Sequence, residues 1–445
     1  MSSRPGEPGP DRPTASVLTL GCKVNQFESA AISRTLNAAG YRFVPKGRPA
    51  DLRVINTCTV THRADVEVRN LIRRADRANP KGRTVVTGCL AQLRPEEMAA
   101  LPGVALVAGQ NDKADFLKLI SGIKTGFDPV IRVSPLGRGH KILDLGFPDF
   151  ERTRAFFRIQ DGCSAACAYC VIPRSRGPSR SLEPDQVFKG VGHYGQAGYN
   201  EVVLTGIHLG AWGLDLTPPS DLTGLLKRLA GPGTGPRLRI SSMEPNEVTG
   251  EMVRLIRSNP RFCPHLHLAL QSGSDQVLAA MGRPYTASFF QDLTISLTAD
   301  RPDFCLGADV LIGFPGEDEA AFAQTMDLAA ELPLAYLHVF SFSRRPHTRA
   351  ASMPGQVPAD EIKRRVKIMR EMSQAKRRAF FERCLGRVRP ALIENTKDRA
   401  TGLSRGLTDN YIQVLVSGPA PAAGEIAPMR LMELTPDGRV LAKAG

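Results

Sequence analysis

The sequence predicts an α/β protein: an N-terminal parallel α/β domain, a central partial (β/α)6 barrel and a small C-terminal all-β barrel. Short apolar runs alternate with helical patterns over about residues 15–125, which is typical of a parallel sheet covered by helices. The same alternation recurs six times over about residues 149–378. From residue 381 to 445, short strand-like runs are separated by Gly and Pro turns, as in small β-barrels.

The amino-acid composition indicates a folded protein of several domains without a membrane span. A chain of 445 residues with 42% apolar residues is long enough for about three folded domains. No apolar stretch approaches the roughly 18 residues that a membrane span needs, and residues 1–14, rich in Pro, Gly and Ser, predict a disordered tail and not a signal peptide. We therefore expect a cytoplasmic protein with no membrane partner. The formal charge of +14 favours a polyanionic partner.

In the N-terminal domain, three predicted strands are each followed, two residues later, by a cysteine. The strands are 16–20, 52–56 and 84–87, and the cysteines are Cys22, Cys58 and Cys89. Because the carboxyl ends of parallel strands meet at one edge of a sheet, these thiols are predicted to converge there. A single one could be an ordinary buried cysteine, but three at equivalent positions favour a shared site.

In the central domain, the six predicted strands are followed by polar residues and glycines. The strands are 155–160, 201–205, 237–241, 265–270, 306–312 and 335–340. Residues at the carboxyl ends of barrel strands commonly form the active-site face. The first of these loops carries the spacing C-x3-C-x2-C, with cysteines at Cys163, Cys167 and Cys170.

Three closely spaced thiolates predict a metal centre with an open position. Iron–sulfur clusters usually take four thiolates, so a three-thiolate site leaves one iron free to bind another molecule and points to chemistry more than to electron storage. Structural zinc sites, in contrast, are normally closed by four ligands in paired short spacings. Neither set of three cysteines has a fourth Cys or His at such a spacing, which opposes a non-catalytic zinc-containing RNA-binding protein.

Two basic regions are candidate RNA contacts. From Glu361 to Arg389 the chain carries eleven Lys or Arg against three Glu, and this segment could equally be a solvated linker helix. A predicted helix with Arg63, Arg69, Arg73, Arg74 and Arg77 has the same two interpretations. The small C-terminal barrel, with predicted strands 388–393, 411–416 and 430–434, is of a type that commonly holds RNA.

Several motifs together resemble the radical S-adenosylmethionine (SAM) superfamily and, within it, the methylthiotransferases. They are Leu20-Gly-Cys-Lys-Val-Asn-Gln26, Asn56-Thr-Cys-Thr-Val-Thr61, Gly88-Cys-Leu-Ala-Gln92, Asp161-Gly-Cys163 through Pro173, Leu270-Gln-Ser-Gly-Ser274 and Gly313-Phe-Pro-Gly-Glu317. The resemblance spans residues 15–445. It implies a methylthiotransferase cluster domain over 15–125, a radical SAM domain over 149–378 and a TRAM-like RNA-binding domain over 381–445.

The resemblance implies two 4Fe–4S clusters and SAM as cofactors. The cluster of Cys163, Cys167 and Cys170 would chelate SAM through its open iron and reduce it to a 5′-deoxyadenosyl radical, which takes hydrogen from C2 of an adenine. The cluster held by the other three cysteines would offer its open iron to a sulfur atom that a second SAM methylates. The protein supplies placement and water exclusion.

Further residues at the strand ends are candidate SAM contacts. Thr205 and Gly206 could present backbone groups to the SAM amino group, Ser242, Glu244 and Gln271 could bond its ribose or methionyl part, and the backbone of Gly313, Gly316 and Glu317 could approach the adenine. Each of these residues could instead belong to a local turn or cap.

Within the family, three motifs resemble the branch that acts on N6-threonylcarbamoyladenosine beside the tRNA anticodon (position 37). They are Gly21-Cys-Lys-Val-Asn-Gln26, Leu204-Thr-Gly-Ile-His-Leu-Gly210 and Leu337-His-Val-Phe340. The chain departs from the usual pattern at His347, where this branch tends to have Gly. Alternatives are the same reaction on isopentenyladenosine or on a ribosomal-protein aspartate. Expected partners are the tRNA anticodon stem-loop, a reductant such as a flavodoxin or ferredoxin, and a sulfur source, with the enzyme as a monomer.

Overall fold

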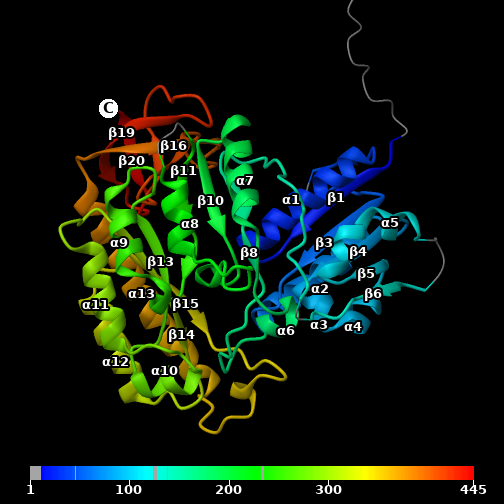
Figure 1. The fold of residues 1–445 in the computed structure, drawn as a ribbon, viewed down its shortest axis with the longest axis horizontal. Helices are drawn as coiled ribbons and strands as arrows, with labels where there is room; N and C mark the ends of the chain where they lie inside the picture. Colours follow the sequence, from blue (N-terminus) through cyan, green and yellow to red (C-terminus); the bar gives the residue numbers. More distant parts are fainter. Residues whose placement is uncertain (1–11, 46, 124–127, 138, 232–234) are drawn as a thin grey trace, which may run out of the picture. The chain divides into compact units, whose positions relative to one another are not determined.

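A computed structural model describes residues 12–45, 47–123, 128–137, 139–231 and 235–445 (Figure 1). The predicted tail, 1–14, lies mostly outside this range. The chain forms two compact units. Unit 1 comprises the chain up to Asp149 together with Val171–Pro178, and unit 2 comprises Phe150–Cys170 and Ser179–Gly445. The predicted α/β fold class is confirmed in both units.

Unit 1 contains a parallel six-stranded sheet in the order β2-β1-β3-β4-β5-β6. In chain order the strands are β1 (Thr14–Thr19), β2 (Arg42–Phe43), β3 (Leu52–Thr57), β4 (Arg83–Gly88), β5 (Val104–Ala108) and β6 (Val130–Arg132). The three predicted strands correspond to β1, β3 and β4. The sequence analysis missed β2, β5 and β6, which have two, five and three residues.

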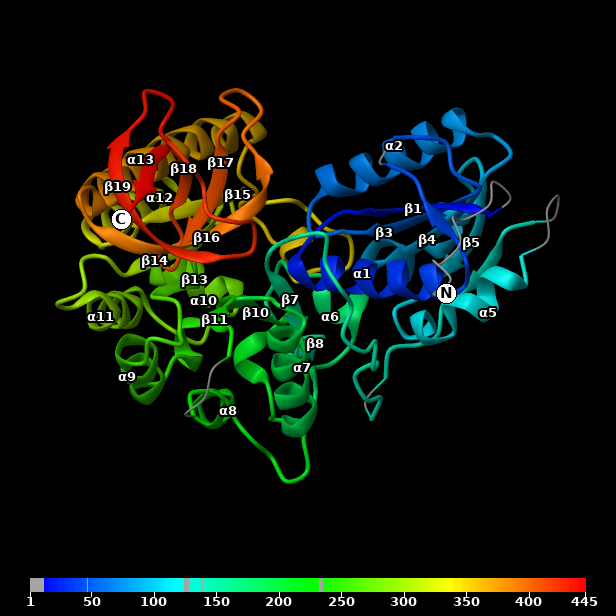
Figure 2. The same ribbon diagram turned by 90° about the horizontal axis from the view of Figure 1, so that it is seen from above.

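Helices cover both faces of this sheet, as Figure 2 shows for α1 and α2. The helices are α1 (Lys23–Ala38), α2 (His62–Ala78), α3 (Cys89–Leu93), α4 (Pro95–Ala99), the 3-10 turn η1 (Asn111–Asp115), α5 (Phe116–Ser121) and α6 (Ile172–Arg176). Val54 of β3 packs with Leu36 of α1 on one face, and Ile55 packs with Ile72 of α2 on the other. Such burial on both faces explains the nearly continuous apolar runs of these strands.

Unit 2 contains the parallel strands of the predicted partial barrel. They are β7 (Ala155–Arg158), β10 (Glu201–Thr205), β11 (Arg237–Ile240), β12 (Ser242–Met243), β13 (His265–Gln271), β14 (Cys305–Ile312) and β15 (Tyr336–Ser341). They pair in the orders β11-β10-β7 and β12-β13-β14-β15. The third predicted strand, 237–241, is thus interrupted at Ser241. The end of the first, 155–160, is a separate short strand, β8 (Gln160–Asp161), antiparallel to β9 (Arg180–Ser181).

Helices follow most of these strands, which completes the alternation that the sequence predicted. They are α7 (Pro184–Gln196), η2 (Leu209–Ala211), α8 (Leu222–Leu229), η3 (Pro245–Glu247), α9 (Gly250–Ser258), α10 (Asp275–Met281), α11 (Ala287–Thr298), α12 (Glu319–Glu331), η4 (Arg349–Ala351) and α13 (Ala359–Cys384). The basic segment that begins at Glu361 is therefore helical up to Cys384. Several of its cations form ion pairs with nearby acids, such as Arg364 with Glu319 at 2.9 Å.

The C-terminal strands form a closed barrel in the order β16-β17-β18-β20-β19. The strands are β16 (Val388–Lys397), β17 (Ser404–Thr408), β18 (Gln413–Val416), β19 (Ile426–Leu434) and β20 (Val440–Ala444). Three of the five were predicted, in β16, β18 and β19. The missed β17 contains Gly406, a residue that weakens any strand pattern, although its neighbours Leu407 and Thr408 are buried.

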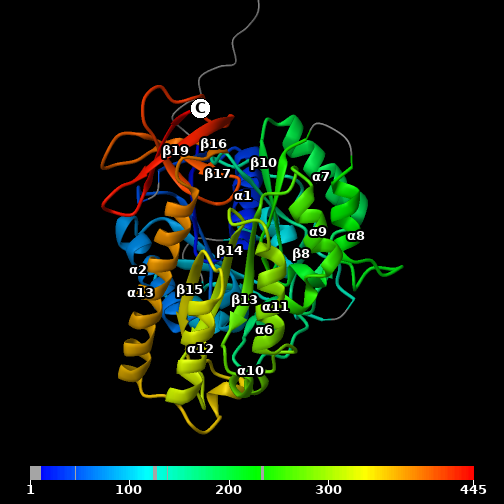
Figure 3. The same ribbon diagram turned by 90° about the vertical axis from the view of Figure 1, so that its left-hand side faces the viewer.

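The small barrel packs against the amino-terminal ends of the parallel strands in unit 2 (Figure 3). Glu201, the first residue of β10, lies 2.7 Å from Arg237 and 2.8 Å from Arg239. The two arginines donate to carbonyls of the barrel, at Pro390 and Asp409. The carboxyl ends of the strands, where the cysteine loop begins, are therefore at the opposite end of the strand set.

Candidate active site with two cysteine trios

The loop trio, Cys163, Cys167 and Cys170, lies in the segment that follows β7 and β8. A backbone hydrogen bond of 3.2 Å from Cys170 N to Cys167 O closes a tight turn within it. The loop is held to the rest of unit 2 through Ala168, whose N–H donates to Met281 O at 2.8 Å and whose carbonyl accepts from Ala350 N at 2.9 Å. Local sequence spacing and this docking together present three free thiols on one loop.

Polar groups from other elements contact the loop trio. Nδ1 of His208 lies 3.4 Å from Sγ of Cys163, and its Nε2 lies 2.6 Å from Oε1 of Glu247. Burial alone would lower the pKa of His208, but its interactions with Cys163 and Glu247 outweigh burial and raise this pKa to about 10. Imidazolium beside a thiol favours the thiolate, the form that binds metals.

Arg283 provides a second positive group at this site. Its Nη1 donates to Sγ of Cys167 at 3.1 Å, its Nε donates to the Tyr285 hydroxyl at 3.0 Å, and its Nη2 pairs with Glu244. The guanidinium is almost fully buried and permanently charged. Arg283 was not among the predicted site residues, because no local pattern distinguishes it. His208 was not among them either, although it follows the end of β10.

The N-terminal trio, Cys22, Cys58 and Cys89, occupies the carboxyl ends of three adjacent strands. Cys22 precedes α1 after β1, Cys58 follows β3, and Cys89 begins α3 directly after β4. The structure therefore brings the three residues to the same sheet edge, as the sequence predicted. Exposure decreases from Cys22 through Cys58 to the buried Cys89.

Contacts at this edge fit a shared three-thiolate centre. Burial and the neighbouring Cys89 raise the pKa of Cys58 to about 12, which reflects two thiols in a common low-dielectric space. A Cβ atom on Gly21 would lie 3.2 Å from Sγ of Cys58, so glycine leaves room for that sulfur. Nε2 of Gln110 lies 3.6 Å from Sγ of Cys89. Both trios therefore offer free thiols beside positive or donor groups, a set suited to iron–sulfur binding, and cluster ligation remains a prediction.

The candidate SAM residues lie at or near the strand ends, but many of them already have partners in the protein. Thr205 is buried, Ser242 is exposed, and Glu244 pairs with Arg283. Gln271 ends β13 with a φ of 63°, a strained value for a residue other than glycine. A Cβ on Gly206 would approach Oε1 of Gln160 at 2.7 Å, so this glycine is required by packing.

The turn of Gly313, Gly316 and Glu317 packs on other parts of unit 2. A Cβ on Gly313 would lie 2.4 Å from Cγ1 of Ile362 on α13. Oε1 of Glu317 lies 2.9 Å from Nη1 of Arg365, which is also on α13. The N–H of Gly316 donates to Gly355 O at 2.8 Å. These contacts explain the glycines without a ligand, and contact with SAM stays a prediction.

A second cluster of ionisable groups lies on neighbouring strands of unit 2. Nε2 of His267 is 2.8 Å from Oδ1 of Asp309, and Nδ1 of His338 is 3.5 Å from the same oxygen. Burial raises the pKa of Asp309, but the two histidines outweigh it and lower this pKa well below its usual range. The two histidines are thus both partnered by Asp309, and the three side chains could also hold a cation.

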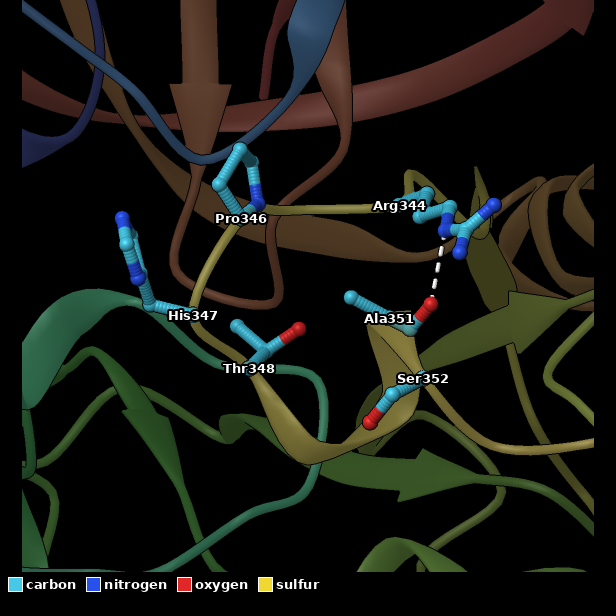
Figure 4. A pocket seen from close by; sticks show the side chains of 6 residues that line it. All are labelled: Arg344, Pro346, His347, Thr348, Ala351 and Ser352. Atoms are coloured by element: carbon cyan, nitrogen blue, oxygen red, sulfur yellow. Dashed lines mark hydrogen bonds between the residues drawn. The ribbon is translucent and has the colours of Figure 1, made fainter.

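A cavity of about 550 Å³ lies at the turn between β15 and α13 and is shown in Figure 4. It is lined by Arg344, Pro346, His347, Thr348, Ala351 and Ser352. Nε of Arg344 donates to Ala351 O at 2.6 Å. His347 has a φ of 66°, which lies in the left-handed region that favours glycine. This conformation is a physical reason for the Gly expected at this position in the threonylcarbamoyladenosine branch.

The predicted RNA-contact helix is α2. Arg63, Arg73, Arg74 and Arg77 are exposed, whereas Arg69 forms an ion pair of 2.5 Å with Glu97. Arg69 is thus partly committed to the protein, and RNA contact by the other four stays a prediction. Across the described segments, no helix combines the length and the apolar character that crossing a membrane would require.

Two family models match the chain in the regions that carry the trios. The Uncharacterized protein family UPF0004 matches residues 14–109, and the Radical SAM superfamily matches residues 157–329. A solved structure of the radical S-adenosylmethionine methyltransferase TsrM from Kitasatospora setae aligns with a TM-score of 0.54 at 16% identity. It covers 76% of this chain and 77% of that one, which supports the fold.

Curated relatives cover nearly the whole chain. The threonylcarbamoyladenosine tRNA methylthiotransferase MtaB of Bacillus subtilis is 37% identical over 94% of each chain, and its namesake in Aquifex aeolicus is 36% identical over 90% of this chain and 96% of its own. A tRNA-2-methylthio-N(6)-dimethylallyladenosine synthase of Pelotomaculum thermopropionicum is 29% identical over 94% of this chain and 96% of its own. The chain therefore belongs to the methylthiotransferase family of the radical SAM superfamily.

Proposed function

We propose that this protein is a tRNA methylthiotransferase that adds a methylthio group to C2 of N6-threonylcarbamoyladenosine beside the anticodon. The observation that carries the proposal is the pair of cysteine trios. The N-terminal trio lies at the carboxyl ends of three parallel strands of unit 1, and the loop trio follows β7 and β8 in unit 2. The relatives at 36–37% identity carry the name of this activity, whereas the relative named for dimethylallyladenosine is at 29%.

The residues of the two units take different roles in this proposal. When bound, the clusters and SAM supply the radical chemistry, the sulfur and the methyl group. Cys163, Cys167 and Cys170 hold one cluster, and the docked loop fixes their positions. Arg283 donates a hydrogen bond to the sulfur of Cys167, which stabilises its thiolate form.

The N-terminal trio holds the second cluster at the edge of a rigid sheet. Because the three cysteines come from three separate strand ends, the register of the sheet determines their spacing. Candidate SAM contacts remain those predicted at the strand ends, from Thr205 and Gly206 to Glu317. We further propose that residues 15–125, 149–378 and 381–445 act as the cluster, radical SAM and TRAM-like RNA-binding domains.

The proposed partners follow from the reaction. The anticodon stem-loop of tRNA is the substrate, and the basic surface of α2 and the small barrel are its candidate contacts. Cluster reduction requires an electron donor such as a flavodoxin or ferredoxin, and a sulfur source must restore the transferred sulfur. We propose that the enzyme acts as a monomer in the cytoplasm, where its substrate tRNA is found.

The direct test is turnover in vitro. The protein is purified anaerobically, reconstituted with iron and sulfide, and incubated with SAM, a reductant and an anticodon stem-loop carrying threonylcarbamoyladenosine. Mass spectrometry of the digested RNA should show the 2-methylthio product together with 5′-deoxyadenosine. A matched stem-loop that carries isopentenyladenosine is the control, and preferential modification of that substrate would contradict the proposed branch.

Loss of the gene provides the cellular test. The 2-methylthio mark on threonylcarbamoyladenosine should disappear from bulk tRNA, while the methylthio mark on isopentenyladenosine and on the ribosomal-protein aspartate should persist. If instead one of those other products is lost, the corresponding alternative is correct. A non-catalytic RNA-binding protein would be colourless and zinc-loaded, in place of brown with about eight irons per chain.

A further inference from the structure

A buried ionic network lies beside the N-terminal trio in unit 1. Its charged members are Glu28 of α1, Lys113 of η1 and Arg176 of α6, and each side chain is at most 1% exposed. Nη1 of Arg176 donates to Oε1 of Glu28 at 2.9 Å, and Nζ of Lys113 donates to Oε2 at 2.6 Å. The guanidinium of Arg176 and the amine of Lys113 thus share one carboxylate away from water. Buried charge is costly unless an opposite charge balances it, so loss of one member would leave its partner buried and unpaired.

The network reaches the cysteine positions through two buried carboxamides. Oδ1 of Asn25 accepts a hydrogen bond from Arg176, while its Nδ2 donates to Leu20 O at 2.7 Å and to Thr57 O at 3.0 Å. These carbonyls lie two residues before Cys22 and one residue before Cys58. Asn25 therefore ties together the two chain segments that present these cysteines, and Arg176 fixes the orientation of Asn25.

Gln110 makes the equivalent connection to the third cysteine. Its Oε1 accepts from Nζ of Lys113 at 2.6 Å, and its Nε2 lies 3.6 Å from Sγ of Cys89. Asn25 and Gln110 thus connect the charged side chains of the network to the segments or sulfur atoms of all three cysteines.

Arg176 belongs to the chain segment that follows the loop trio, although the network lies beside the N-terminal trio. Arg176 follows Cys170, the last member of the loop trio, by six positions. After Cys170 the chain returns to unit 1 for Val171–Pro178 and is again part of unit 2 from Ser179. Within unit 1, α6 packs against α3, the helix that begins at Cys89. The segment that follows one trio therefore completes the surroundings of the other.

We propose that Arg176 is a positioning residue for the cluster of Cys22, Cys58 and Cys89, and that its charge raises the reduction potential of that cluster. The inference rests on the proposed function, which places a cluster at this trio. A reduced cluster carries one more negative charge than the oxidised one, so a buried cation favours the reduced state. Glu28, buried in the same network, has the opposite effect.

The experiment isolates the second cluster. In a background of Cys163→Ala, Cys167→Ala and Cys170→Ala, the reconstituted protein is titrated with reductant and followed by electron paramagnetic resonance. Arg176→Gln should disfavour reduction about tenfold, a shift of about 59 mV to lower potential for a one-electron couple. Arg176→Lys, which keeps the charge, should restore most of the potential. Glu28→Gln should shift it to higher potential.

Opposite shifts from Arg176→Gln and Glu28→Gln separate electrostatics from a merely structural role. Arg174→Gln is the matched control, because Arg174 is exposed on the same helix and should leave the potential unchanged. If Arg176→Gln does not retain iron, the reduction potentials of Glu28→Gln and Arg176→Lys test the inference. Less than a twofold change in the reduction equilibrium for Glu28→Gln would overturn the inference. Failure of the triple-alanine background to bind any cluster would instead overturn the proposed site.

Discussion

The loop trio lies within eight consecutive residues, whereas the N-terminal trio is drawn from a span of 68 residues and from three strands. The loop trio depends mainly on a local turn, which is closed by the hydrogen bond from Cys170 to Cys167. The N-terminal trio depends on the register of a sheet and on turns that lie beside other strands. Comparison of the two teaches that similar three-thiolate sites can have very different sensitivity to mutations elsewhere in the fold.

Removal of one cysteine from either trio should abolish the function of that site alone. Cys167→Ala should abolish formation of 5′-deoxyadenosine and all product. Cys89→Ala should keep 5′-deoxyadenosine formation but abolish methylthio transfer, because the radical site remains intact. Each variant should bind about four irons in place of about eight, measured by iron analysis after anaerobic reconstitution. Cys263→Ala, at a buried cysteine outside both trios, should keep about eight irons.

The glycine that directly precedes Cys89 should affect only the N-terminal trio. Gly88 has a φ of 95°, and a Cβ there would lie 2.5 Å from Thr57 O and from Oδ1 of Asn56. Gly88→Ala should therefore cost more than the roughly 1–2 kcal/mol of backbone strain alone and displace Cys89. The measurements are the denaturant midpoint and the iron content, which should fall to about four.

Gly40→Ala is the matched control for this prediction. Gly40 has a φ of 88°, but nothing lies within 4 Å of the Cβ that alanine would add. This variant should show the backbone strain with both clusters retained. Equal behaviour of the two variants would mean that the close approach at Gly88 does not position Cys89.

Arg283 should matter to the loop trio alone. It donates to Sγ of Cys167 at 3.1 Å, so Arg283→Met removes a charged hydrogen bond worth about 1.5–3 kcal/mol. The rate of 5′-deoxyadenosine formation should fall about tenfold or more, and the potential of the loop-trio cluster should decrease. Measured in the Cys167→Ala background, the other cluster should keep its potential. A change there would show that the two sites are electrostatically coupled.

The last prediction is a pH dependence of cluster loading at the N-terminal trio. Burial and Cys89 raise the pKa of Cys58 to about 12, so this thiol is protonated near neutral pH and must release its proton to bind metal. Iron occupancy in the Cys167→Ala background should therefore increase from pH 6.5 to 8.5, by up to about tenfold in binding constant per pH unit. An occupancy independent of pH would contradict this mechanism.

The central strands β1, β3 and β4 of unit 1 and most parallel strands of unit 2 could be predicted, because buried strands keep apolar runs whatever packs on them. The predictions were less accurate where the signal depends on neighbours. The strand expected at 237–241 is interrupted at Ser241, and β17 is stabilised by the closed barrel more than by its own residues. Likewise, no local pattern marks Gly313 as a contact of α13, because Ile362 is far away in the sequence.

The sequence by itself determined the alternation of strands and helices, the C-x3-C-x2-C loop and the strand-end positions of Cys22, Cys58 and Cys89, because these depend on local periodicity and spacing. Only the tertiary structure decided that Arg283 contacts Cys167 and that Arg176, Lys113 and Glu28 form one buried network. Residues so distant along the chain meet only when the sheets have formed. Their charges are then removed from water, and each must find a partner inside the protein.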